Sequence, residues 1–257
     1  MDLDLKGSVV FVTGASGSIG NEICRAFLDE GALVAAFSRR GMPTGDAERT
    51  ISLIGDVRDP EAVDHAMRET EKRFGRVDIC IACAGVWPPK PTLLHKQEPS
   101  RAREVVETNV LGSMWTARAF VSALERTGPR QDGRGASIIV IGSTAGRFGE
   151  RGHSEYAASK SALRGLVASL KNEIVLVDPK ARVNLVEPGW TVTPTIEEYL
   201  ESHGVLETTM KTMPLRQLAA PEDVARAVLF LASPSMSRHI TGEILGVTGG
   251  MEGRVLW

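Results

Sequence analysis

The chain has 257 residues, of which 42% are hydrophobic and 24% are charged. This length suits one α/β domain with a full core better than two domains. The formal net charge of -2 argues against binding to nucleic acid or to an anionic membrane. No apolar run approaches the roughly 18–20 residues of a membrane span, and the amino terminus lacks a signal-peptide core. We expect a soluble cytoplasmic protein.

The chain opens with a strand, a glycine-rich turn and a helix. A short apolar run over 6–13 predicts a buried strand, the turn follows at Gly14–Gly20, and an amphipathic helix runs from Asn21 to Gly31. Glycines let the backbone approach a pyrophosphate, and a helix N-terminus offers unpaired N–H groups and the positive end of a dipole. This order therefore predicts a phosphate-binding turn.

The next predicted strand, Ala32–Phe37, ends in Ser38, Arg39 and Arg40. Dinucleotide sites that prefer NAD(H) often carry an acid here, which bonds the ribose hydroxyls and repels a 2′-phosphate. In this chain the acid is missing, and a hydroxyl beside two guanidinium groups suits a phosphate dianion. The pattern favours NADP(H), with NAD(H) possible. The alternative is a solvated basic turn before the loop over 41–45.

Strands alternate with helices along the rest of the chain. Asp59 and Pro60 begin a helix as N-cap and first helical residue. We predict strands over 49–54, 77–82, 137–141, 181–186 and 243–247, and helices over 98–126, 154–177 and 221–231. The helix over 98–126 is one long or broken helix. This alternation predicts an α/β, doubly wound, mainly parallel sheet with helices on both faces in a single domain.

Three cysteines, Cys24, Cys80 and Cys83, lie in apolar segments, which suits a reducing compartment. Cys80 and Cys83 have C-x-x-C spacing, but residues three apart on a strand point to opposite faces. No second Cys or His pair lies nearby to complete a zinc site. We interpret the three as structural thiols and expect no metal.

The segment from Ser143 to Lys160 carries the candidate chemistry. Ser143 follows a predicted strand, and Tyr156 and Lys160 lie four positions apart on one face of a predicted helix. An ammonium beside a phenol favours the phenolate, so we expect a lowered Tyr156 pKa and general acid/base chemistry. On its own, this pair could equally be an ordinary, partly exposed helix pair.

Parallel α/β sheets bind ligands at the carboxyl ends of their strands. The candidate segments all fall at such ends: Thr13–Gly20, Ser38–Arg40, Asp56, Ala84–Gly85, Ser143 and Pro188–Gly189. Asn109 is unusual in a helix interior, so its side chain is either exposed or bonded to buried polar groups. The region over 190–214 lacks periodicity and is predicted to be a mobile segment that covers the substrate.

With these motifs in order, the chain resembles the short-chain dehydrogenase/reductase family along essentially its whole length. The resemblance rests on Thr13-Gly-Ala-Ser-Gly-Ser-Ile-Gly20, Asp56-Val57, Ala84-Gly85, Asn109, Ser143, Tyr156-x-x-x-Lys160 and Pro188-Gly189. It implies a Rossmann-like fold, a nicotinamide dinucleotide, and reduction of a carbonyl or oxidation of an alcohol. It also implies a homotetramer, and the apolar end of the tail over 251–257 would otherwise be exposed.

The resemblance also assigns roles. Tyr156 would donate or accept the proton, Ser143 would hold the substrate oxygen, Lys160 would bond the nicotinamide ribose and depress the Tyr156 pKa, and Asn109 would position a water. The residues implied at the cofactor are Gly14, Ser16, Ser18, Ile19, Gly20, Ser38, Arg39, Arg40, Asp56, Val57, Ala84, Gly85, Asn109, Tyr156, Lys160, Pro188, Gly189, Thr191 and Thr193.

The chain departs from the family pattern at three places. Ser18 stands where the middle glycine is usual, Ala82 and Cys83 replace two asparagines, and Thr248 replaces an acid before the final glycine pair. Candidate substrate contacts are Ser143, Trp87, His153 and Trp190, with Met210 and Met213 as further pocket candidates. These Trp and Met residues could equally be packing residues, and His153 is expected at the rim.

Two functions from different classes remain. The first is an oxidoreductase acting on a small carbonyl or alcohol, with no nucleic-acid or membrane partner. The second is a dinucleotide-binding regulatory protein without turnover, which would not need all four catalytic side chains. An epimerase or dehydratase of the longer relatives is disfavoured, because the chain lacks the length for a separate substrate domain.

Overall fold

The computed structural model describes residues 2–42, 46–203 and 206–255. Within them a seven-stranded sheet has the order β3-β2-β1-β4-β5-β6-β7, and every neighbouring pair is parallel. The strands are β1 (Val9–Thr13), β2 (Leu33–Ser38), β3 (Thr50–Ile54), β4 (Ile79–Ala82), β5 (Ser137–Ile141), β6 (Arg182–Pro188) and β7 (Ile244–Val247). The predicted fold class is confirmed.

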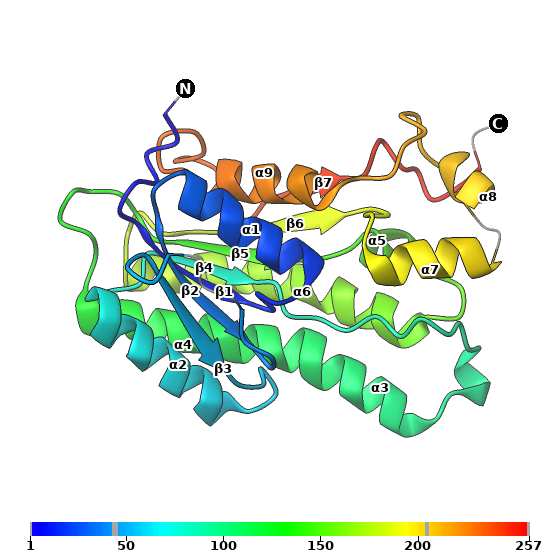
Figure 1. Cartoon of the computed structure of the whole chain (residues 1–257), viewed down its shortest axis with the longest axis horizontal. Coiled ribbons are helices and arrows are strands. Elements are labelled where there is room, and N and C mark those ends of the chain that lie inside the picture. The colour runs from blue at the N-terminus through cyan, green and yellow to red at the C-terminus, as the bar shows by residue number, and fades with distance from the viewer. Residues whose placement is uncertain (1, 43–45, 204–205, 256–257) are drawn as a thin grey trace.

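Helices cover both faces of this sheet (Figure 1). On one face lie α1 (Ser18–Asp29) and α9 (Pro221–Ala232). On the other lie α2 (Pro60–Phe74), α4 (Gly112–Thr127) and α6 (Ser154–Glu173). The central strands β1, β4 and β5 are buried at every position, which explains why their sequences are continuous apolar runs instead of alternating ones.

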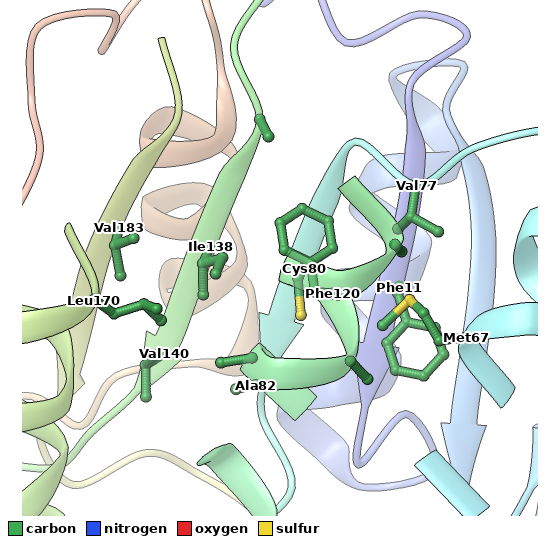
Figure 2. Close-up of a cluster of buried hydrophobic side chains, with 14 of the residues drawn as sticks. Phe11, Met67, Val77, Cys80, Ala82, Phe120, Ile138, Val140, Leu170 and Val183 are labelled. Carbon is green, nitrogen blue, oxygen red and sulfur yellow. The ribbon is translucent and has the colours of Figure 1, made fainter. Parts of the chain in front are cut away.

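A separate hydrophobic cluster packs between the sheet and each helical layer. Figure 2 shows one of them, in which Phe11 and Cys80 of the sheet meet Met67 of α2 and Phe120 of α4. Cys24 belongs to the cluster on the other face of the sheet, and Cys83 packs against that cluster. The prediction that Cys80 and Cys83 point to opposite faces is therefore confirmed. Burial raises the pKa of Cys83 to about 11, so it remains a thiol.

The predicted helix over 98–126 is unbroken, but its winding changes in the middle. It consists of α3 (Pro99–Val106), a π-helical turn (Glu107–Leu111) and α4. The π turn adds one residue to the helix, and Asn109 lies within it. The predicted helix over 154–177 is shorter than expected, because α6 ends at Glu173 and a 3₁₀ turn, Ile174–Leu176, follows.

The region over 190–214 contains two helices that periodicity did not predict, α7 (Pro194–His203) and α8 (Leu206–Met210). Two further short elements are a 3₁₀ turn at Leu94–Lys96 and α5 (Ala145–Phe148). No helix in the described ranges is long and apolar enough to cross a membrane.

Candidate functional site

A cavity of about 1160 Å³ lies at the carboxyl ends of the strands. It brings together nearly all of the residues predicted for the cofactor and catalysis. Those in its wall are Gly14, Ser16, Ser18, Ile19, Gly20, Ser38, Arg39, Arg40, Asp56, Val57, Ala84, Gly85, Ser143, Tyr156, Lys160, Pro188, Gly189, Thr191 and Thr193. Trp87 and Trp190 also line it, whereas Asn109, His153, Met210 and Met213 do not.

The glycine-rich turn is too tightly packed for side chains at two positions. A Cβ on Gly20 would lie 2.3 Å from the carbonyl oxygen of Gly14, and a Cβ on Gly14 would lie 2.8 Å from Cα of Ala84. Gly14 also has a φ of +70°, a conformation that favours glycine. Gly17 caps α1 without a side-chain hydrogen bond. The first N–H groups of this helix are therefore left without a side-chain cap and border the cavity, as a phosphate site requires.

Ser18, the departure from the family pattern in this turn, lies in the first turn of α1 with its side chain exposed in the cavity wall. Its hydroxyl therefore adds a donor beside the helix N-terminus without altering the winding of the helix.

Thr13 holds the end of β4 next to this turn. Its Oγ1 donates to the Ile81 carbonyl at 3.3 Å and accepts from the backbone N–H groups of Cys83 and Ala84 at 3.1 and 3.2 Å. These bonds keep β4 beside β1 beyond the end of the regular ladder. The backbone at Cys83 is thus bonded by Thr13, although the chain lacks the asparagines that are usual in the family here.

Ser38, Arg39 and Arg40 lie together beyond β2, at one end of the cavity. Both arginines are exposed. Ser38 is 6% exposed, and among the described residues its Oγ has no hydrogen-bond partner. A buried hydroxyl without a partner is costly unless a ligand bonds it. Nearby, Arg58 bonds the Asp56 carboxylate, with Nη2 2.7 Å from Oδ2, and lowers the pKa of Asp56.

Ser143, Tyr156 and Lys160 meet at the centre of the cavity. Ser143 follows β5, and Tyr156 and Lys160 lie on α6, where Ser143 hydrogen-bonds the Tyr156 hydroxyl. Lys160 Nζ donates to the Ile141 carbonyl at 2.9 Å and lies 5.8 Å from the centre of the Tyr156 ring. The helix spacing thus places all three side chains in one wall.

The expected lowering of the Tyr156 pKa is wrong for this structure. Burial raises it to about 12, the bond from Ser143 opposes the rise, and the charge of Glu150 adds to it. Lys160 does not lower the Tyr156 pKa here, because its ammonium is bonded to the Ile141 carbonyl and lies over the ring instead of at the hydroxyl. Burial also lowers the pKa of Lys160, to about 8.

Asn109 is fully buried and outside the cavity wall. Its Oδ1 accepts from Val86 N at 2.8 Å, and its Nδ2 donates to Val86 O and Ser159 Oγ, each at 3.0 Å. The structure thus selects the second alternative, in which the side chain bonds buried polar groups. The amide joins the loop after β4 to α6, directly behind Gly85 and Lys160.

The other end of the cavity is aromatic, and His153 is not at its rim. His153 is completely buried, its ring stacks on Trp87 at 4.9 Å, and its Nε2 lies 2.9 Å from the Pro88 carbonyl. Tyr199 contacts Trp87 edge-on at 5.1 Å and stacks on Trp190 at 6.0 Å. Met213 is 1% exposed, which favours the packing interpretation for it.

Sequence reasoning did not identify Glu150, whose carboxyl lines the cavity beside Trp87. Burial raises its pKa to about 7. The hydrogen bond from Trp87 lowers this pKa, and the charge of Glu155 raises it by a smaller amount. The sequence could have indicated Glu150 only through its position between Ser143 and Tyr156, seven residues after Ser143.

Met251 and Gly253 of the tail also line the cavity, whereas Leu256 and Trp257, the apolar end considered for assembly, lie outside the described residues. Within the described ranges, no group of three or more metal-ligating side chains could hold a metal ion.

Comparisons with known proteins agree with this geometry. The model of a family described as enoyl-(acyl carrier protein) reductase matches residues 14–252. Galactitol 2-dehydrogenase (L-tagatose-forming) of Cereibacter sphaeroides is 34% identical over 255 residues, covering 96% of this chain and 95% of the relative. The 3-oxoacyl-[acyl-carrier-protein] reductase FabG of Thermotoga maritima is 29% identical over 255 residues, covering 96% and 98%.

Solved structures show the same fold over the whole chain. Ligand-free aldohexose dehydrogenase of Thermoplasma acidophilum has a TM-score of 0.82 and 27% identity, covering 100% of this chain and 98% of that one. A short-chain dehydrogenase/reductase of Brucella melitensis, named glucose/ribitol dehydrogenase, has a TM-score of 0.85 and 25% identity, covering 97% and 98%. The chain therefore belongs to the short-chain dehydrogenase/reductase family and is an NAD(P)-dependent oxidoreductase of that family.

Proposed function

We propose that this protein transfers hydride between NADP(H), in preference to NAD(H), and a carbonyl or secondary-alcohol substrate, with Tyr156 as the general acid and base. The observation that carries this proposal is the meeting of Ser143, Tyr156 and Lys160 in one cavity wall that continues to the glycine-rich turn. A regulatory protein that only binds a dinucleotide has no need of this arrangement.

The residues present fit a phosphorylated dinucleotide. The glycine-rich turn has no room for a Cβ at Gly14 or Gly20, and the N-terminus of α1 borders the cavity. The unpartnered Ser38 hydroxyl, with Arg39 and Arg40 beside it, suits a 2′-phosphate. The nicotinamide supplies or accepts the hydride, and Pro188, Gly189, Thr191 and Thr193 would lie along it.

The chain's own residues would handle the proton. Tyr156 donates its phenolic proton to the substrate oxygen during reduction and takes it back during oxidation. Ser143 bonds the same oxygen and stabilises the charge that develops on it. A pKa raised by burial suits a phenol that stays protonated until the substrate is in place. Lys160 would lower this pKa only when its ammonium turns from Ile141 toward the ribose and the phenol.

Asn109 would fix the backbone behind this group. Its amide bonds hold Val86 and α6 together, so the loop after β4 and the helix that carries Tyr156 and Lys160 keep one spacing. The resemblance also implies that Asn109 positions a water in a proton relay. Asn109 would do so from its buried position behind the cavity wall.

Substitution of Tyr156 separates the enzyme from the binding protein. Tyr156→Phe removes one hydroxyl, so the protein should still fold and bind NADPH by fluorescence, while steady-state turnover of any accepted ketone falls about 10²- to 10⁴-fold. Near-normal turnover by this variant would show that Tyr156 is not the acid. Wild-type protein that binds NADPH yet reduces no ketone in a broad panel would favour the regulatory alternative.

Arg39→Asp tests the cofactor preference. Loss of a charge-assisted bond to the 2′-phosphate, worth about 1.5–3 kcal/mol, should weaken NADPH binding roughly tenfold to a hundredfold relative to NADH. Arg68→Asp makes the same charge change at an exposed position on α2 and serves as the control. An equal NADPH/NADH ratio in wild type and Arg39→Asp would mean that Arg39 is only a solvated turn residue.

Two features beyond the chemistry belong to the same proposal. The segment over 190–214 would close over cofactor and substrate, and Trp190, Ile196 and Thr212 already line the cavity. The protein would assemble as a homotetramer, and Val106 and Met114, each 40% exposed, offer apolar surface along α3 and α4. A monomer by light scattering at micromolar concentration would contradict the assembly.

A further inference from the structure

The aromatic end of the cavity contains an acidic side chain, that of Glu150. Glu150 follows α5, and its side chain is only 19% exposed. Trp87 Nε1 donates to both carboxylate oxygens, at 3.1 and 3.3 Å. His153 Nδ1 lies 3.1 Å from Oε1 without hydrogen-bond alignment, and burial lowers the pKa of this imidazole. No lysine or arginine among the described residues forms an ion pair with Glu150.

The aromatic wall around Glu150 is fixed by its own packing. His153 stacks on Trp87, and its Nε2 is hydrogen-bonded to the Pro88 carbonyl, so one side chain holds both the ring and the start of its loop. Tyr199 meets Trp87 edge-on and stacks on Trp190, which joins α7 to the same wall. Trp87, with its Nε1 aimed at Glu150, is therefore held before any substrate arrives.

The loop that carries Trp87 is also tied to α6. Arg101 Nε donates to the buried Glu155 carboxylate at 2.7 Å, and Arg101 Nη1 donates to the Lys90 carbonyl at 2.6 Å. Gln97 Nε2 bonds the same carboxylate and the Thr92 carbonyl. Glu155 is thus paired, in contrast to Glu150. The loop and the helix N-terminus form one preorganised unit.

This arrangement leaves Glu150 able to accept further hydrogen bonds. A carboxylate has about four acceptor sites, and Trp87 supplies a single N–H. A partly buried acid without its full set of donors is costly, so a ligand with hydroxyl groups would complete the set. The rings of Trp87 and Trp190 would pack against the C–H groups of such a ligand. An acyl thioester has no donor beside its reacting carbonyl and would leave the acid unsatisfied.

A cationic ligand fits this site less well. Aromatic cages for cations surround the ion with several ring faces, whereas one face of Trp87 is covered by His153 and one face of Trp190 by Tyr199. An anionic substrate would be repelled by Glu150 itself.

We propose that Glu150 is a specificity-determining residue whose carboxylate accepts a hydrogen bond from a substrate hydroxyl on a carbon other than the reacting one. The substrate class is then a polyol or the corresponding hydroxyketone. This proposal rests on the proposed function, since it assigns the substrate class of the same cavity.

The test compares two five-carbon alcohols that differ in hydroxyl content, ribitol and 2-pentanol, with NADP⁺. The ratio of their kcat/KM values should fall about tenfold or more in Glu150→Gln, because the charge-assisted bond becomes a neutral one. Glutamine has the same shape and can still accept from Trp87. Glu125→Gln, an exposed position on α4, is the matched control and should leave the ratio at its wild-type value.

Two results would overturn the proposal. One is an equal loss for both alcohols in Glu150→Gln, and the other is a wild-type preference, with NADP⁺, for 2-pentanol, a 3-hydroxyacyl-CoA or an amino alcohol over every polyol tested. Calorimetric binding of ribitol to the NADP⁺-loaded Tyr156→Phe protein, with and without Glu150→Gln, provides an arm that needs no turnover. Tighter binding with Glu150 present would support the proposal even if the wild type proved inactive, which separates its failure from that of the proposed function.

Discussion

Replacing Glu150 by glutamine should stabilise the folded protein, and more strongly as the pH rises. Burial raises the pKa of Glu150 from 4.5 to about 7, and the paired Glu155 adds a little to the rise. Because the folded pKa lies above the unfolded one, ionisation of this carboxyl opposes folding. The cost is absent below pH 4.5, grows between pH 4.5 and 7, and is complete above pH 7.

The magnitude follows from the two pKa values. At about 1.4 kcal/mol for each pKa unit, the full cost is roughly 3 kcal/mol, and about 2 kcal/mol of it develops between pH 5.5 and 8.5. The side chain is only 19% exposed, so solvent screening removes little of this cost. Glutamine keeps the volume and one oxygen for Trp87 Nε1 but cannot ionise, so its stability should lack this dependence on pH.

Urea unfolding followed by tryptophan fluorescence, at pH 5.5, 7.0 and 8.5, measures the effect. The free energy of unfolding of Glu150→Gln minus that of wild type should increase by about 2 kcal/mol across this range. Glu125→Gln, exposed on α4, controls for the general loss of a negative charge. A difference that is constant with pH, or that decreases toward pH 8.5, would refute the assignment of Glu150 as the buried acid that ionises against folding.

Three further outcomes are expected. Gly20→Ala should cost about 1–3 kcal/mol of stability in urea unfolding and weaken NADPH binding in fluorescence titration, since its Cβ would clash with the Gly14 backbone. Arg101→Met should cost about 3–5 kcal/mol, because it leaves the Glu155 carboxylate buried without its cation; an effect below 1 kcal/mol would contradict the pairing. Hydrogen exchange over 190–214 should slow when NADPH and substrate are both bound, and equal protection with and without them would count against closure.

The elements of the fold could be predicted because each has a local pattern. The apolar runs of the central strands, the Asp59 N-cap and the glycines before α1 all act over a few residues, and the structure confirms them. The residues that line the cavity could be predicted for the same reason, because the parallel sheet brings strand ends together. Helices α7 and α8 were missed because their short segments lack a clear apolar period.

The electrostatics of the site could not be predicted in this way. Glu150 is buried by Trp87, which is 63 residues away in sequence, so nothing near it in the chain shows its environment. His153 is likewise buried by contact with Trp87, which is distant from it in sequence. The Tyr156 pKa depends on which atom the Lys160 ammonium bonds, and the spacing of four residues fixes the face of the helix but not the direction of the flexible lysine side chain.

The π-helical turn at Glu107–Leu111 lets one long helix pack on two different neighbours within the same helical layer. One residue more than an α-helix holds in this stretch shifts the buried stripe by about 100° around the axis. As a result, α4 packs against α2 and the sheet, whereas α3 leaves the sheet and packs on α6. Deletion of any one residue in this turn would bring both halves into phase, so that the contacts with α2 and with α6 would compete for a single face of the helix.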